Sequence, residues 1–230
     1  MLPQGASSQV AKELTLNKTA TPGRRLSPED REQQILNGAI KFFAERGFGG
    51  QTRELALQLG ITQPLLYRYF PTKRSLIERV FEEVYINKLD PGWSEALVDR
   101  THSLHQRLCD FYCRYSEATY QNEWIRIYMF SALMDEPLNK HYVNLIEKKL
   151  LTTICGELRH HWGLPSLQET PLDQLEMEQV WIMHGGLFYH AIRKHIYRST
   201  VSRDFEQIVS RAVDTILEGG KPGPPLNAKT

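Results

Sequence analysis

The stretch GITQPLLYRYFPTK, from Gly60 to Lys73, places an amide, a guanidinium and two phenols close together on what must be a short helix. Amide and guanidinium groups can read base edges in the major groove of DNA, and an aliphatic side chain can contact a thymine methyl group. We expect Gln63, Leu65, Arg68 and the two tyrosines to point mostly outward. This stretch therefore offers the chemistry of a DNA-binding helix.

Two short helices joined at Gly60 would position these side chains. A helix from about Thr52 to Leu59 ends at this glycine, where a left-handed backbone costs little. Thr62 can cap the next helix, and Pro71 ends it. Together the two helices form the pattern of a helix-turn-helix. The alternatives are that Tyr67 and Tyr69 form a half-buried pair and that the short basic helix is ordinary surface.

The segments ILNGAIKFFAERGF and TRELALQLGITQPLLYRYFPTKRSLI resemble the N-terminal domain of the tetracycline-repressor-like (TetR) regulators. The resemblance follows the family pattern from Ile35 to Ile77 and covers about a fifth of the chain. It implies a homodimer that binds a palindromic double-stranded DNA operator and is controlled by a small-molecule effector. A repressor released by its effector is the usual form.

The resemblance also implies roles for single residues. Tyr67, Lys73 and Thr52 would contact DNA phosphates, and Gln63, Leu65, Arg68 and Tyr69 would lie at or near the bases. The sequence departs from the family pattern at Gln51, Pro64 and Leu65, so the operator sequence cannot be inferred from it.

Charge and chain breakers divide the protein. Residues 1–79 contain 12 Lys and Arg against 7 Asp and Glu, whereas the whole chain has a net charge of only +1. A basic N-terminal part is expected when one end of a protein meets a polyanion. Helical periodicity predominates, which predicts an all-α fold. The predicted divisions are a disordered tail at 1–26, a helix-turn-helix domain at 27–89, a ligand-binding and dimerisation domain at 90–218, and a disordered tail at 219–230.

The larger domain is predicted to contain long helices over about 95–120, 122–134, 138–162, 171–198 and 203–217. Aromatic residues and methionines are frequent there. Such residues usually form the core, but they can also line an apolar ligand pocket. The candidate pocket residues for a small apolar or aromatic effector are Trp124, Tyr128, Met129, His184 and Phe188. The last two helices would pair with their copies in a homodimer, although the same apolar stripe could face its own domain.

A second constellation could bind a metal. His102, His105, Cys109 and Cys113 are spaced by three, four and four residues, which places them on one stripe of a continuous helix. One helix cannot surround a tetrahedral zinc ion, so structural packing is the preferred interpretation. No enzyme motif is present, and we expect neither catalytic activity nor a cofactor. The alternative to a DNA-binding regulator is a helical protein-interaction module.

The sequence contains no apolar run of the roughly 20 residues that a membrane-spanning helix needs. The first residues lack the apolar region of a secretory signal, so a cytoplasmic protein is expected. The chain has three cysteines, a small and odd number that does not suit a disulfide framework, so we expect reduced thiols.

Overall fold

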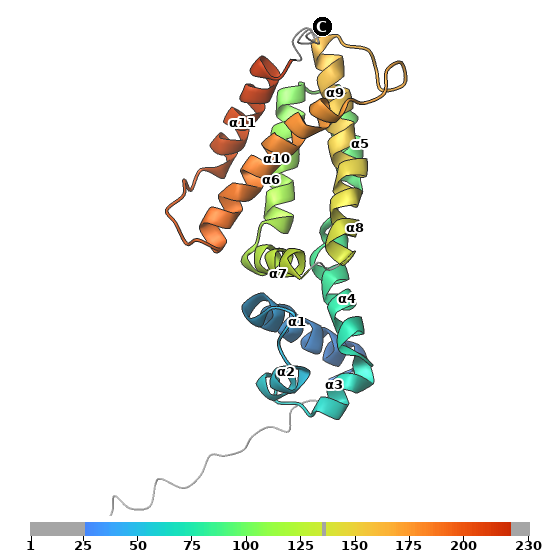
Figure 1. Cartoon of the computed structure of the whole chain (residues 1–230), viewed down its shortest axis with the longest axis vertical. Coiled ribbons are helices and arrows are strands. Elements are labelled where there is room, and N and C mark those ends of the chain that lie inside the picture. The colour runs from blue at the N-terminus through green and yellow to red at the C-terminus, as the bar shows by residue number, and fades with distance from the viewer. Residues whose placement is uncertain (1–25, 135–136, 222–230) are drawn as a thin grey trace, which may run out of the picture.

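A computed structural model describes residues 26–134 and 137–221, which form helices and connecting turns with no strand (Figure 1). The predicted all-α fold is confirmed. The predicted tail at 1–26 lies outside the described residues except for Leu26, and residues 222–230 of the C-terminal tail lie outside them as well. None of the helices in the described ranges is long and apolar enough to cross a membrane.

The first four helices form a compact end of the molecule. Ser27 caps the first of them by accepting a hydrogen bond from the backbone N–H of Asp30. Buried residues of this helix, such as Leu36 and Phe43, face the helices that follow. The four helices are α1 (Pro28–Arg46), α2 (Thr52–Gln58), α3 (Gln63–Tyr69) and α4 (Lys73–Val84).

The remaining helices build the larger part of the molecule, and α4 leads into it (Figure 1). A single 3-10 turn, Ile86–Lys88, follows α4. In Figure 1, α8 and α9 form one column and α11 lies beside α6 and α10. The helices are α5 (Gly92–Val98), α6 (Leu104–Thr119), α7 (Asn122–Leu133), α8 (Pro137–Ile146), α9 (Thr152–Trp162), α10 (Gln174–His195) and α11 (Phe205–Gly219).

The helix expected over 95–120 is in fact two helices. Asp99 ends α5 because its carboxylate accepts hydrogen bonds from the backbone N–H and the hydroxyl of Thr101, at 3.1 and 2.7 Å. Ser103 then caps α6 by accepting from the backbone N–H of Gln106. Asp and Ser side chains compete in this way with helical backbone hydrogen bonds. The helix expected over 138–162 begins one residue earlier, at Pro137, and contains a π-helical segment at Glu147–Leu151.

One hydrophobic cluster runs from the first four helices into the larger part of the molecule. Helix α7 packs on α1, and the Arg126 guanidinium donates a 2.5 Å hydrogen bond to the carbonyl oxygen of Ala44. The Tyr85 hydroxyl, just after α4, donates to the carbonyl oxygen of Trp124 on α7 at 3.1 Å. The chain thus has a shared core across residue 90, and the predicted division at 27–89 and 90–218 stays a prediction.

Candidate DNA-binding surface and ligand cavity

The turn between α2 and α3 is built around Gly60. Its φ of 64° lies in the left-handed region that glycine tolerates best. The backbone N–H of Ile61 donates to the carbonyl oxygen of Ala56 at 3.0 Å, and Thr62 caps α3 by accepting from the N–H of Leu65. Buried Leu66 anchors α3 to the core. The two helices therefore have the arrangement of a helix-turn-helix, at the end of the molecule farthest from α9 (Figure 1).

Three of the predicted DNA contacts are joined to one another. The hydroxyl groups of Thr52 and Tyr67 lie 2.8 Å apart in a hydrogen bond, and the Gln63 amide donates to the Thr52 hydroxyl at 3.1 Å. Thr52 is only 7% exposed. Its side chain therefore orients two residues of α3, a positioning role that the sequence did not reveal because it depends on how α2 crosses α3.

The other predicted contacts on α3 differ in exposure. Arg68 and Tyr67 are exposed, as expected. Leu65 is half-buried. Tyr69 is half-buried and packs against the core, so less of its ring is available to a partner than the outward placement predicted.

Lys73 is the first residue of α4 and follows a capping box. Thr72 accepts from the backbone N–H of Ser75, while the Ser75 hydroxyl oxygen accepts from the backbone N–H of Thr72. This cap fixes the start of α4 and with it the position of Lys73, which forms no ion pair with any described residue. Arg53, exposed in the first turn of α2, adds a cation that was not among the predicted contacts. The sequence signal that could have identified Arg53 as a DNA contact is its position next to Thr52.

Four of the five predicted pocket residues line one cavity of about 200 Å³ in the larger part of the molecule. They are Trp124, Tyr128, His184 and Phe188. The fifth, Met129, packs against the core but does not line this cavity. The other lining residues come from α6, α8 and α10 and the turn after α6, and are Tyr115, Tyr120, Tyr142, Val143, Ile146, Trp181 and Gly185.

The cavity is uncharged. Burial lowers the pKa of His184 to about 4, so its imidazole is neutral at pH 7. Burial also raises the pKa of the Tyr120 and Tyr142 hydroxyls, which stay protonated. Such a site favours ligands without charge, because a buried ion would lose its hydration without a partner.

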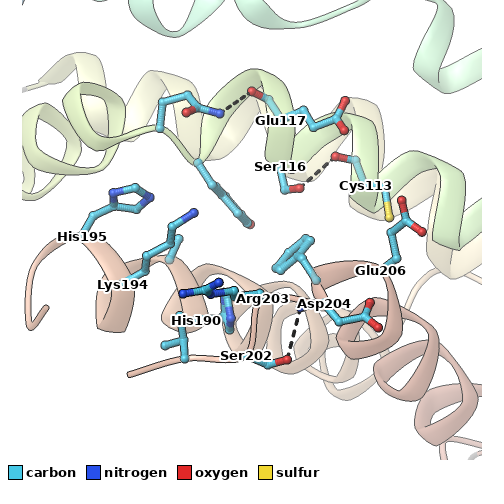
Figure 2. Close-up of a pocket in the computed structure, with 15 residues that line it drawn as sticks. Cys113, Ser116, Glu117, His190, Lys194, His195, Ser202, Arg203, Asp204 and Glu206 are labelled. Atoms are coloured by element: carbon cyan, nitrogen blue, oxygen red, sulfur yellow. Dashed lines mark hydrogen bonds between the residues drawn. The ribbon is translucent and has the colours of Figure 1, made fainter. Parts of the chain in front are cut away.

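A second pocket, of about 500 Å³, lies between α6, α10 and the start of α11 (Figure 2). Figure 2 shows Glu117 on α6 across from Lys194 on α10, with Arg203 near Lys194 and Glu206 near Cys113 at the other side of the pocket. The pocket therefore mixes both signs of charge. Tyr120 lines this outer pocket as well as the aromatic cavity.

The predicted stripe of possible metal ligands is broken. His102 lies in the turn before α6, so it does not share a helix with His105, Cys109 and Cys113. The prediction of one stripe was wrong because Asp99 and Ser103 interrupt the helix. His105 instead lies 3.2 Å from a carboxylate oxygen of Asp214 on α11. In residues 26–134 and 137–221, no three His, Cys, Asp or Glu side chains are placed to hold a metal ion.

Comparison with known proteins agrees with this geometry. Residues 35–80 match the family model described as bacterial regulatory proteins, tetR family. The chain is 36% identical over 64 residues to the HTH-type transcriptional regulator LuxR of Vibrio harveyi, covering 27% of this chain and 31% of that protein. It is 30% identical over 82 residues to the tetracycline repressor protein class A from transposon 1721 of Escherichia coli, covering 32% of this chain and 38% of the repressor. The matches thus span about a third of each of these relatives.

The whole fold also has a solved counterpart. A TetR-like transcriptional regulator from Rhodococcus sp. RHA1 has a similar structure, with a TM-score of 0.61 over 85% of this chain and 100% of that chain. The two sequences are 18% identical. This likeness shows the fold over most of the chain, well beyond residues 35–80, which match the family model.

Proposed function

Since residues 35–80 match the tetR family of bacterial regulatory proteins, we propose that the chain is a ligand-responsive, sequence-specific transcriptional regulator. The observation that carries the proposal is the helix-turn-helix at one end of the molecule, in which Thr52 orients Gln63 and Tyr67 of α3. The partner is a palindromic double-stranded operator, and repression relieved by an effector is the proposed mode. A protein-interaction module is not favoured by the family match.

The DNA contacts divide into two kinds. Tyr67, Lys73 and the start of α2 at Thr52 bind phosphates, which position the protein without reading sequence. Gln63, Leu65 and Arg68 lie on α3 and face the major groove, with Tyr69 at its edge because part of that ring is buried. The hydrogen bonds of Thr52 hold the Gln63 amide and the Tyr67 hydroxyl in place before DNA arrives, which reduces the entropy lost on binding.

A palindromic operator requires two copies of α3, and α10 supplies a surface for pairing them. Leu175, Ile182 and Tyr189 are 73%, 73% and 51% exposed and are spaced by seven residues, so they lie on one face of this helix. Buried Val209, Val213 and Ile216 of α11 face its own subunit against α6 and α10. Within a homodimer formed by the last two helices, α10 therefore provides the apolar contact and α11 a polar margin.

The effector binds in the aromatic cavity, with Trp124, Tyr128, His184 and Phe188 around it. Met129 does not contact the effector directly but packs against the core that supports the cavity. The chemistry of these walls fits a small, apolar or aromatic molecule.

The proposal is tested by binding of the purified protein to the DNA upstream of its own gene, followed by fluorescence anisotropy at several salt concentrations. We expect tight binding that weakens steeply with salt. Arg68→Ala should change the preferred base at one position of each half-site, since one bidentate base contact discriminates by about 1–3 kcal/mol. Equal affinity for this DNA and for a scrambled duplex would contradict the proposal.

A further inference from the structure

The size of the aromatic cavity limits its ligand. A dry apolar cavity of about 150 Å³ holds one benzene molecule, whereas pockets for drug-sized ligands begin at about 300 Å³. The cavity between α6, α7, α8 and α10 has a volume of about 200 Å³. It has room for a single six-membered ring with one or two small substituents, and long acyl chains or fused-ring compounds exceed it.

The walls of the cavity suit an aromatic ring. The rings of Trp124 and Tyr128 are stacked with an interplanar angle of 6° and a centroid distance of 5.1 Å. Phe188 presents its ring to both at close to a right angle, with interplanar angles of 77° and 76°. Aromatic pairs favour these offset-stacked and edge-to-face arrangements, so a bound ring finds both faces and edges to contact.

The polar atoms on the lining residues require an oxygen on the ligand. Tyr115 and Tyr142 satisfy each other, with their hydroxyl oxygens 2.8 Å apart. The Tyr120 hydroxyl, the Trp124 indole N–H and the His184 Nδ1 are buried and have no hydrogen-bond partner among the described residues. Buried polar atoms nearly always have a partner, and an indole N–H can only donate. The missing partner is therefore a hydrogen-bond acceptor.

The cavity has no charged lining residue that could pair with an ionic ligand. None of the side chains that line the cavity in the described part of the chain belongs to Asp, Glu, Lys or Arg. His184 is 7% exposed and lies against the rings of Tyr112, Tyr115 and Trp181, with no carboxylate among its ring contacts. A carboxylate or ammonium group in the cavity would lose its hydration without gaining a counter-charge.

We infer that the cavity binds a small, uncharged, single-ring aromatic compound that carries a hydroxyl or carbonyl oxygen. Phenol is the simplest compound of this class. The role of this compound as effector rests on the proposed function, but binding to the cavity does not depend on DNA.

The test compares phenol, toluene and benzoate as ligands of the full-length protein at pH 7 by isothermal titration calorimetry without DNA. The three rings are similar in size, but only phenol and benzoate carry oxygen and only benzoate is charged. We expect phenol to bind about fivefold or more tightly than toluene because toluene leaves the buried polar atoms unpaired. Benzoate should bind more weakly than either. Equal affinity for phenol and toluene, benzoate binding as tightly as phenol, or no phenol binding would overturn the inference.

Variants then assign the polar contact. Tyr120→Phe and Trp124→Phe each remove one of the unpaired polar groups, and we expect at least one of them to lower the phenol-to-toluene affinity ratio about fivefold. Tyr112→Phe is the matched control, since its hydroxyl is also buried without a described partner but Tyr112 does not line the cavity. This control should leave the ratio unchanged. A ratio unchanged in both cavity variants, or lowered equally by Tyr112→Phe, would overturn the assignment.

Failure of this inference is distinct from failure of the proposed function. Anisotropy of labelled operator DNA, measured with and without phenol, reports the regulatory role separately. Phenol binding without a change in DNA affinity would leave the ligand class standing and remove the effector role. DNA binding without phenol binding would remove the inferred ligand class and leave the proposed DNA-binding function standing.

Discussion

Lys73 stands where α4 begins, and the capping box of Thr72 and Ser75 fixes its backbone. If its ammonium group binds a DNA phosphate, Lys73→Ala removes one phosphate contact from each subunit. The slope of log affinity against log salt should then fall in magnitude by about 0.9 for each phosphate that the protein no longer neutralises, which is about twice that for a dimer. The preferred sequence should stay the same.

Lys148→Ala is a charge-matched control for this prediction, because Lys148 is exposed in the larger part of the molecule. Fluorescence anisotropy from about 50 to 200 mM salt gives the slopes. A slope for Lys73→Ala equal to those of the wild type and Lys148→Ala would exclude the phosphate contact.

At the level of single residues, the sequence predicted which residues belong to the candidate DNA-binding surface better than it predicted how far each side chain is buried. Arg68 was recognisable because a guanidinium is costly to bury unless a carboxylate pairs with it. The burial of Thr52 and the partial burial of Tyr69 depend on the crossing of α2, α3 and the core. That crossing is a tertiary property that residue type and spacing do not specify.

The helices themselves were largely predictable where caps are strong. Ser27 with Pro28, and Thr62 with Pro64, define the starts of α1 and α3 as expected. The break at Asp99 was missed because the apolar spacing continues on both sides of it, and only the hydrogen bonds to Thr101 reveal the turn. An Asp or Ser can end a helix when its side chain forms hydrogen bonds with nearby groups of the chain. In a sequence, such a residue is hard to distinguish from an Asp or Ser that lies within a helix.

A buried ion pair between Arg107 of α6 and Glu157 of α9 holds α5 and α6 on α9. Arg107 is 7% exposed and donates to the carboxylate of Glu157, 4% exposed, at 2.7 Å. It also donates to the carbonyl oxygens of Leu97 and His102. Arg100 donates to both carboxylate oxygens of Glu157, at 2.8 and 3.2 Å, from a half-exposed position.

We expect Glu157→Gln to lower the free energy of unfolding by about 3 kcal/mol at pH 7, since it leaves the Arg107 charge buried without a counter-charge. Arg100→Ala removes only the half-exposed partner of Glu157 and should cost less than about 1 kcal/mol. Urea denaturation followed by circular dichroism measures both. Equal destabilisation in the two variants would show that the buried pair does not hold these helices.

The same pair predicts a dependence on pH. Burial alone would raise the pKa of Glu157, but hydrogen bonds from Arg100 and Arg107 outweigh it and the pKa is lowered. A carboxyl whose folded pKa lies below its unfolded value stabilises the protein above that unfolded value, about 4.3 for Glu. The stability difference between the wild type and Glu157→Gln should therefore shrink as the pH falls below about 4.3.

At the scale of the whole molecule, the exposed apolar face of α10 is the surface through which we expect two subunits to pair. Ile182→Glu puts a charge at the centre of the apolar face that also contains Leu175 and Tyr189. We expect a folded monomer in size-exclusion chromatography with light scattering. Apparent affinity for a palindromic operator should fall by about 100-fold or more, because the two half-sites are no longer bound together.

Leu133→Glu provides the control, since Leu133 is 80% exposed at the end of α7 and does not belong to α10. It should leave both the mass and the DNA affinity unchanged. A dimeric Ile182→Glu protein would place the subunit contact elsewhere on the molecule.

The aromatic cavity and the helix-turn-helix are joined by a short physical connection. Trp124 forms a wall of the cavity, and its carbonyl oxygen accepts the hydrogen bond from Tyr85, which follows directly on α4. The Tyr85 ring also stacks on Phe81 of α4, with centroids 4.4 Å apart. A ligand that moves Trp124 can therefore shift α4, and with it Lys73 and α3.

Tyr85→Phe removes this hydrogen bond and keeps the ring. If the bond couples the two sites, the factor by which phenol changes DNA affinity should fall about fivefold, which corresponds to about 1 kcal/mol for one hydrogen bond. Calorimetry of phenol binding and anisotropy of DNA binding, each measured with and without the other ligand, give the coupling from both directions. By linkage the two values must agree.

Tyr112→Phe tests whether any buried hydroxyl would have the same effect, because Tyr112 is buried and its ring packs against Phe111 and His184. Its coupling factor should equal that of the wild type. A Tyr85→Phe protein in which phenol changes DNA affinity by the wild-type factor would exclude this hydrogen bond as the connection. The bond between Arg126 and the carbonyl of Ala44, which joins α7 to α1, would then be the next contact to remove.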